Sequence, residues 1–272
     1  MMHVNGAERR RLMDKLRDIF KGDIIGRELV FFQSAASTND EALQIIQAND
    51  NPEGMVIFAD SQERGRGRFN RSWVSPPGVN LYFTVVLKPP LHSKDAALLT
   101  LMAAVAAVSA IREYTGLYAG IKWPNDILIR DKKAGGILAE IKANAKGIIF
   151  AAVGIGLNVN LSMDLLPEEI RARATSLMKE KGEPVDRIKL LSHILSRMER
   201  WYKVLLNNGK KILIDECVGL SSTVGNRVDI MAPDGVKSGI AEGINEDGAL
   251  VLKSDSGSVE MIYAGDVTIL KS

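Results

Sequence analysis

The sequence has few residues that could form covalent cross-links or bind structural metals. Its 272 residues include one cysteine, Cys217, and three histidines. A single thiol excludes an intramolecular disulfide, and His3, His92 and His193 do not have the spacing of a zinc site. The first residues also lack the apolar core of a secretory signal. Together these absences predict a cytoplasmic protein without structural zinc.

The chain also lacks a large excess of charge and a long hydrophobic run. Lysine and arginine total 35 and the acidic residues 33, which gives a net charge of +2. The longest apolar stretch, Ala96–Ile111, contains Thr100 and Ser109 and is shorter than the roughly 18 to 20 residues that span a bilayer. We therefore expect no nucleic-acid and no membrane partner, and any anion to be bound by a local cluster.

Common nucleotide and hydrolase motifs are missing. The sequence contains neither a P-loop ending in Gly-Lys-Ser/Thr nor a Gly-x-Ser-x-Gly elbow. The segment 154–160 superficially resembles a dinucleotide fingerprint, but Val159 stands at its third glycine position and no amphipathic helix follows. A Rossmann site is therefore excluded, and the alternative is a strand end that brings the Asn158 amide near a base.

What the sequence does contain is an arginine-glycine loop over residues 62–68, followed by Arg71 and Trp73. Gly65 and Gly67 lack a Cβ and permit positive φ, so backbone amides and guanidinium groups can approach one anion closely. A solvated basic loop or an RNA-contacting segment is the alternative. Because the loop is short, unrepeated and set in a globular pattern, we favour a ligand-binding loop.

A second motif, Lys122–Asp126, follows further along the chain. Each of its residues alone could be an ordinary turn or core residue. A carboxylate that attacks a phosphate ester, however, brings together two anions that repel by about 4 kcal/mol at about 4 Å in an effective dielectric near 20. A hairpin could place Lys122 beside Lys133, where each charge-assisted hydrogen bond contributes about 1.5 to 3 kcal/mol. The two motifs together predict a site that activates a carboxylate with a nucleotide.

The hydrophobic patterns predict an α+β fold. We expect an amphipathic helix over residues 8–20, a buried helix over 96–114 and one further helix over 184–218. Strands are expected at 29–32, 55–59, 81–87, 121–123, 127–129, 136–141 and 147–155. The tight turns between the last four favour antiparallel pairs over crossover units. The turn-rich tail predicts a small β-barrel. The expected units are an N-terminal helical extension over 1–26, a catalytic domain over 27–218 and the β-barrel over 219–272.

An ordered set of motifs resembles the biotin protein ligases. Its members are Ser37-Thr38-Asn39, Gly65-Arg66-Gly67-Arg68 with Trp73, Gly78–Tyr82, Lys122–Asp126, Lys133 with Gly135–Leu138, Gly154–Asn158 and Ala174–Leu177. The set covers most of residues 27–160 and is far more specific than any one member. The resemblance implies a class II synthetase-like, mixed and largely antiparallel sheet with helices. It also implies the monofunctional type, without a regulatory DNA-binding domain.

The resemblance implies two half-reactions, with ATP and biotin as substrates and Mg²⁺ accompanying ATP. Biotin's carboxylate attacks the α-phosphorus to give biotinoyl-5'-AMP, and a lysine amine of a biotin carboxyl carrier protein then attacks the mixed anhydride. A lipoate-protein ligase and, more distantly, a nucleic-acid-binding module are the alternatives. We also expect a homodimer, on the argument that a strand near Gly154 is left at the edge of the sheet.

By matching positions, the resemblance implies three overlapping sets of site residues and assigns no metal-binding residue. The catalytic set is Lys122, Arg66, Arg68 and Asp126. The biotin-binding set is Ser37, Thr38, Asn39, Gln62, Arg66, Gly67, Arg68 and Lys133. The nucleotide-binding set is Trp73, Lys122, Asn125 and Asn158. One position departs from the family pattern, because Asn70 replaces a glycine, and asparagine tolerates the left-handed geometry of such a turn.

Overall fold

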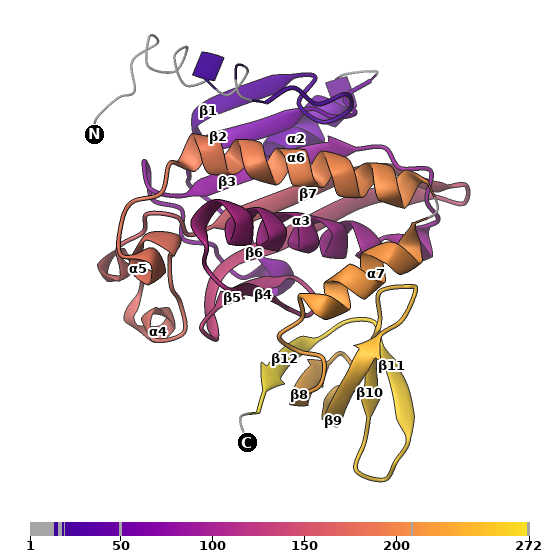
Figure 1. Cartoon of the computed structure of the whole chain (residues 1–272). Coiled ribbons are helices and arrows are strands. Elements are labelled where there is room, and N and C mark those ends of the chain that lie inside the picture. The colour runs from indigo at the N-terminus through magenta and orange to yellow at the C-terminus, as the bar shows by residue number, and fades with distance from the viewer. Residues whose placement is uncertain (1–13, 16–17, 19, 49–50, 208, 271–272) are drawn as a thin grey trace.

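The computed structural model of the chain describes residues 14, 15, 18, 20–48, 51–207 and 209–270. Its centre is a seven-stranded sheet with the order β1-β2-β3-β7-β6-β5-β4 (Figure 1). The strands are β1 (Leu29–Ala35), β2 (Val56–Gln62), β3 (Leu81–Leu87), β4 (Ala119–Lys122), β5 (Asp126–Ile129), β6 (Lys132–Asn144) and β7 (Gly147–Leu157). Only β1 and β2 pair in parallel, which confirms a mixed and largely antiparallel sheet.

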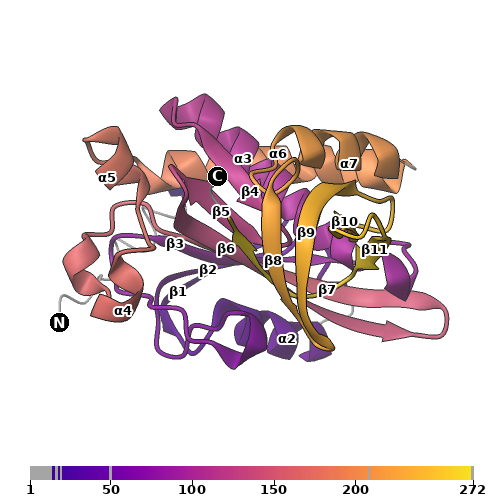
Figure 2. The ribbon, with the colours of Figure 1, turned by 90° about the horizontal axis from the view of Figure 1, so that it is seen from below.

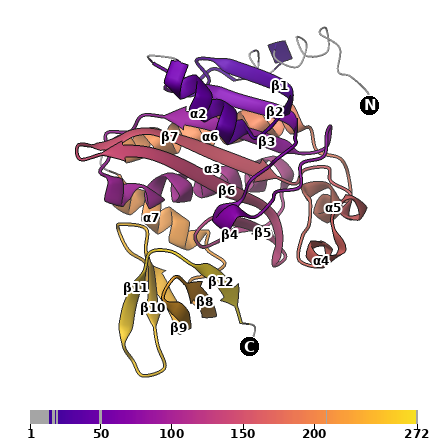
Figure 3. The same ribbon diagram turned by 180° about the vertical axis from the view of Figure 1, so that it is seen from behind.

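Helices cover both faces of this sheet. The helix α2 (Thr38–Ala48) connects the two parallel strands and lies on one face (Figure 3). The helices α3 (Ala97–Thr115), α6 (Arg187–Leu206) and α7 (Lys210–Gly219) lie on the other (Figure 2). The helix α2 buries Ala42 and Ile46 in a small separate core. Burial on both faces explains why β3 is apolar at nearly every position.

The helix α3 is the core of the larger layer. It is buried at almost every position from Leu98 to Ile111 and packs against α6 and α7. By length and composition the helix beginning at Ser93 could cross a membrane, but 72% of its apolar window is buried inside the protein. This confirms the predicted buried helix.

The helix expected over residues 184–218 is two helices. The helix α6 ends at Leu206 and α7 begins at Lys210, and the amide of Gly209 donates to the carbonyl of Val204 at 3.0 Å. The apolar pattern continues across the break, so periodicity alone does not detect it. The Asn-Asn-Gly sequence at 207–209 is the local signal, because both residue types favour helix ends.

The small C-terminal domain is an open sheet and not the closed barrel that its turns suggested. Its strands are β8 (Arg227–Ala232), β9 (Gly235–Ile244), β10 (Leu250–Lys253), β11 (Val259–Ile262) and β12 (Asp266–Ile269). Their order is β11-β10-β9-β8-β12, so β11 and β12 form the two edges in the described part of the chain. Both edge strands are four residues long, and each pairs only with its inner neighbour.

The expectation of a sheet edge near Gly154 is wrong. This residue lies on β7, which pairs with β3 on one side and β6 on the other. The edges of the large sheet are β1 and β4. Residues 220–222 cover part of β4, where the amide of Ile121 donates to the carbonyl of Leu220 at 2.9 Å. In the described residues, β1 is thus the edge of the large sheet that no neighbouring segment covers in this way.

The helix expected over residues 8–20 lies mostly outside the described residues. One of its described members, Lys15, forms an ion pair with Asp186 at the start of α6, at 2.8 Å. Nearby, the buried Glu199 accepts hydrogen bonds from the amides of Ile24 and Ile25. These contacts fasten the segment before β1 to α6.

Candidate active site

One cavity of about 610 Å³ brings together every site residue named from the sequence. Its walls are the arginine-glycine loop, the start of α2, the β4–β5 connection, β6, β7 and the strand β12 of the small domain. The predicted residues that line it are Ser37, Thr38, Asn39, Gln62, Arg66, Gly67, Arg68, Trp73, Lys122, Asn125, Asp126, Lys133 and Asn158.

We call one part of the site the polar end, defined by Ser37, Thr38, Asn39, Gln62 and Thr84. The Thr38 amide donates to Gln62 Oε1 at 2.9 Å. The Thr84 hydroxyl donates to Asn39 Oδ1 at 2.6 Å and is bonded to the Thr38 hydroxyl at 2.9 Å. All but Gln62 are buried. Because buried polar groups are held by one another, this end is rigid before any ligand arrives.

The amide of Asn39 is fully used inside the protein. Its Nδ2 donates to the carbonyl of Leu138 at 3.1 Å and to Glu140 at 2.8 Å. A Cβ on Gly154 would lie 2.2 Å from Asn39 Oδ1, so only glycine fits there. The backbone of β7 therefore packs directly on Asn39, which supports the floor of the polar end.

The loop turns at different residues from those expected. Gly67 has an extended backbone with φ −119°, and the left-handed residues are Phe69 at 55° and Asn70 at 57°. The expectation that Asn70 preserves a left-handed turn is confirmed. Gly65 is required for a different reason, because a Cβ there would lie 2.5 Å from the carbonyl oxygen of Trp73.

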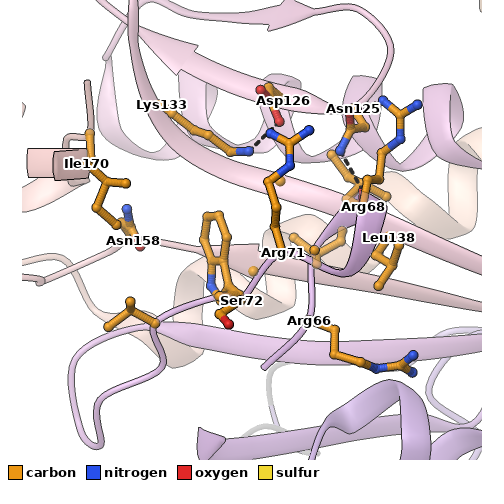
Figure 4. Close-up of a pocket in the computed structure, with 18 of the residues that line it drawn as sticks. Arg66, Arg68, Arg71, Ser72, Asn125, Asp126, Lys133, Leu138, Asn158 and Ile170 are labelled. Atoms are coloured by element: carbon orange, nitrogen blue, oxygen red, sulfur yellow. Dashed lines mark hydrogen bonds and ion pairs between the residues drawn. The ribbon is translucent and has the colours of Figure 1, made fainter. Parts of the chain in front are cut away.

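Arg66 faces away from the other cations of the cavity (Figure 4). Its Nη2 lies 2.6 Å from Asp40 and 2.7 Å from Glu140. Glu140 also accepts from Asn39, so a continuous chain of hydrogen bonds links the polar end to the arginine-glycine loop. In this structure the Arg66 guanidinium thus binds carboxylates of the protein.

We call the opposite part the cationic end, defined by Arg68, Arg71, Lys122 and Lys133. Asp126 lies between the two lysines, 3.2 Å from Lys122 Nζ and 2.6 Å from Lys133 Nζ. The expected approach of these lysines is therefore confirmed, and Figure 4 shows Lys133 pointing to Asp126. Arg68 Nη1 donates to Asn125 Oδ1 at 3.0 Å. Burial lowers the pKa of Arg68, and Asp266 and Asp126 oppose that effect.

The cavity also has a flat aromatic wall. The indole of Trp73 lies against Gly156, where a Cβ would be 2.6 Å from Nε1. In the described residues this buried Nε1 has no hydrogen-bond partner. Lys133 Nζ lies 5.5 Å from the ring centroid, and Asn158 follows β7 and donates to the carbonyl of Thr175 at 3.0 Å. The wall suits a planar base that stacks on the indole.

Several lining residues carry no signal in the sequence motifs. Ile170 and Arg173 enter from the segment before Ala174, and residues 266–269 enter from the small domain. Arg173 directly precedes the Ala174–Leu177 motif, so a basic residue beside that motif was the available clue. The contact of β12 with the cavity brings together segments that lie far apart in the chain. No local sequence pattern predicts such a contact.

Comparison with known proteins agrees with this arrangement. Residues 31–160 match the model of the biotin/lipoate A/B protein ligase family, and residues 223–270 match the biotin protein ligase C-terminal domain. The bifunctional ligase/repressor BirA of Bacillus subtilis is 34% identical over 256 residues, which cover 94% of this chain and 78% of that protein. The chain belongs to the biotin protein ligase family. The biotin--[acetyl-CoA-carboxylase] ligase of Mycobacterium tuberculosis is 32% identical, with 94% of each chain covered.

Solved structures of biotin protein ligases share the fold. The Aquifex aeolicus enzyme in complex with biotin and ATP has a TM-score of 0.77 and 28% identity, with 90% of this chain and 100% of that chain covered. The Leishmania major ligase in complex with biotinyl-5-AMP has a TM-score of 0.60 at 22% identity and supports the fold alone. The match to a biotin ligase C-terminal domain and the names of these relatives disfavour the lipoate alternative.

Proposed function

We propose that this biotin protein ligase converts biotin and ATP to biotinoyl-5'-AMP and pyrophosphate, and then transfers the biotinoyl group to a lysine of a biotin carboxyl carrier protein. One observation carries the proposal: polar side chains held by a buried hydrogen-bond network and a cluster of cations line the same cavity. A fused ring system needs fixed hydrogen-bond partners, and the meeting of two anions needs fixed positive charge. The cavity supplies each at its own end.

In the first half-reaction, Ser37, Thr38 and Gln62 would bind the biotin ring. The carboxylate would then extend towards Lys133. A carboxylate oxygen attacks the α-phosphorus, a P–O bond forms, and the bond to pyrophosphate breaks. Lys122 and Lys133 are already held together by Asp126, so their charge can act where the two anions meet.

In the second half-reaction, the carrier lysine attacks the acyl carbon, AMP leaves, and the amine loses a proton. The carboxylate of Asp126 lies beside both lysines and would position the incoming amine. Trp73, Asn125 and Asn158 would contact the nucleotide. Arg173 adds a cation to the same cavity, since it is one of the lining residues.

Arg66 would change partners during the cycle. It is now bound to Asp40 and Glu140, and the phosphate of the adenylate would replace one of these carboxylates. Gly67 and Arg68 would close with it over the intermediate. Exchange of one anion for another leaves the guanidinium paired throughout, which keeps its desolvation cost low.

Magnesium would enter with ATP. In the described residues no group of three or more His, Cys, Asp or Glu side chains could hold a metal ion. Magnesium at nucleotide sites commonly needs only one or two carboxylates, because substrate phosphates and water supply the other ligands. The cavity carboxylates fit that pattern, and the ion would neutralise part of the phosphate charge.

The remaining expectations are a cytoplasmic location, a monofunctional enzyme without a nucleic-acid partner, and a homodimer. Self-association through a sheet edge would use β1 and not the strand near Gly154. Sedimentation of the full chain with and without biotin and ATP tests for a dimer, and a single monomeric species under both conditions would contradict it.

The activity is tested by incubating the protein with a carrier domain, biotin, magnesium and ATP. Mass spectrometry should show addition of one biotinoyl group to one carrier lysine. Exchange of pyrophosphate into ATP should depend on biotin and not on lipoate. Lipoate-dependent exchange, or no exchange with either acid, would refute the proposal.

A further inference from the structure

The entrance to β12 touches three cations of the active site. The carboxylate of Asp266 forms an ion pair with Arg71. The preceding carbonyl, that of Gly265, accepts from Arg68 Nη1 at 3.2 Å. The following carbonyl, that of Val267, accepts from Lys122 Nζ at 3.1 Å. Three consecutive residues of the small domain therefore contact three cations of the catalytic domain.

In each of these contacts the small domain supplies an oxygen atom, from a backbone carbonyl or from a carboxylate. The oxygens of a polyphosphate chain can accept the same kinds of bonds from arginine and lysine as these carbonyl and carboxylate oxygens do. The arginine-glycine loop supports two of the cations, since Arg68 and Arg71 lie 4.8 and 5.5 Å from the Phe69 ring centroid. The loop thus holds two of these cations, while the small domain supplies one carboxylate and two carbonyl oxygens to the three.

We infer that Asp266 is a positioning residue that occupies the place of a nucleotide phosphate on Arg71, and that ATP binding displaces it. The inference rests on the proposed function, because it assigns the polyphosphate of ATP to the cationic end. Two anions on one guanidinium repel each other, and a polyphosphate carries more negative charge than one carboxylate, so it should compete with Asp266 for Arg71. When phosphate binds Arg71, the ion pair between Asp266 and Arg71 breaks, and β12 becomes less firmly held against the cavity.

The exchange has two consequences. Before ATP binds, Asp266 keeps Arg71 pointed into the site and limits repulsion between neighbouring cations. During binding, the same ion pair competes with phosphate and weakens the apparent affinity for ATP. Biotin binds at the other end, so its affinity should not depend on Asp266.

The test compares Asp266→Asn with Asp255→Asn in the full chain. Asp255 pairs with Arg227 on the same small domain and does not line the cavity, so it is a matched control. Asp266→Asn should lower the KM for ATP in biotin-dependent exchange by about two- to fivefold, the range expected for an exposed ion pair, and leave the KM for biotin unchanged. Asp255→Asn should change neither. A raised or unchanged KM for ATP in Asp266→Asn would overturn the inference.

A binding measurement separates this inference from the proposed activity. Inorganic tripolyphosphate, measured by calorimetry without biotin, should bind Asp266→Asn about two- to fivefold more tightly than the unmodified protein. In an Arg71→Ala background the same substitution should have no effect, because the competed cation is gone. Equal effects in both backgrounds would show a general charge effect and refute the exchange.

If Asp266→Asn does not fold, hydrogen exchange of the unmodified protein still decides the question. Tripolyphosphate should speed exchange of the 266–269 amides and leave the β9–β10 pair unchanged. Unchanged or slower exchange at 266–269 would overturn the inference. Absence of biotin-dependent ATP exchange, by contrast, would refute the proposed function and leave the tripolyphosphate result to be judged separately.

Discussion

At the polar end of the cavity, the buried side chains of Thr38 and Asn39 on α2 bind that of Thr84 on β3 of the large sheet. At the cationic end, the side chains are partly exposed and bind a second domain. The polar end therefore needs no ligand to complete it, whereas the cationic end is held by contacts that a substrate can replace. The difference suggests that one end selects the acid and the other responds to the nucleotide.

The largest expected effect is at the cationic end. Lys122→Ala should lower the rate of adenylate formation by about 100-fold or more, because charge fixed at the reacting phosphate acts mainly in the transition state. Biotin binding, measured by calorimetry, should change little. Lys146→Ala, at an exposed turn, is the control. Equal losses in biotin binding and in adenylation would contradict the division between the two ends.

Two glycines on β7 sharpen the comparison, because they lie two residues apart, one against Asn39 of the polar end and the other against the Trp73 wall. Gly154→Ala presses on Asn39 and should raise the KM for biotin by about 10- to 100-fold, as overpacking of a rigid site does. Gly156→Ala presses on Trp73 and should instead raise the KM for ATP. Gly243→Ala, with open space around its Cβ position, should alter neither. Steady-state kinetics of all three would reveal whether the ends are separate.

Arg68→Gly should release the adenylate from the site. The substitution removes the hydrogen bonds to Asn125 and to the carbonyl of Gly265, each worth about 1 kcal/mol, so escape should rise about 30-fold. Released adenylate would then label lysines of a bystander protein. Mass spectrometry of added serum albumin measures this labelling. Unchanged labelling would show that Arg68 does not retain the intermediate.

The smallest expected effect is at the polar end. Thr84→Val keeps the shape of the side chain and removes the hydroxyl that joins Thr38 to Asn39. The KM for biotin should rise by less than about tenfold, because one network bond is worth about 1 kcal/mol. The KM for ATP should stay unchanged. A matching rise in both would mean that the polar network also orders the nucleotide site.

Much of the large domain could be predicted from the sequence, because its signals are local. The apolar run at 81–87 became β3, and the tight turns at 123–125 and 130–131 joined the strands that bring Lys122 and Lys133 to Asp126. The left-handed backbone of Asn70 also followed from its residue type. In each case a few neighbouring residues determine the outcome.

Features that depend on distant residues could not be predicted. The order of strands places β7 inside the sheet between β3 and β6, and its pairing with β3 joins segments far apart in the chain. The ion pairs of Arg66 with Asp40 and Glu140 require three separate elements to meet. The same holds for the approach of β12, whose residues gave no pattern beyond short strands and turns.

Because β12 is the last strand of the chain and also a wall of the cavity, the two ends of the protein are not equivalent for engineering. An affinity tag or fluorescent label added after this strand would emerge beside the nucleotide site and crowd it. The segment before β1 is tied to α6 through Glu199, near the edge of the large sheet that lies away from the small domain (Figure 1). Labels for kinetic work are better placed there.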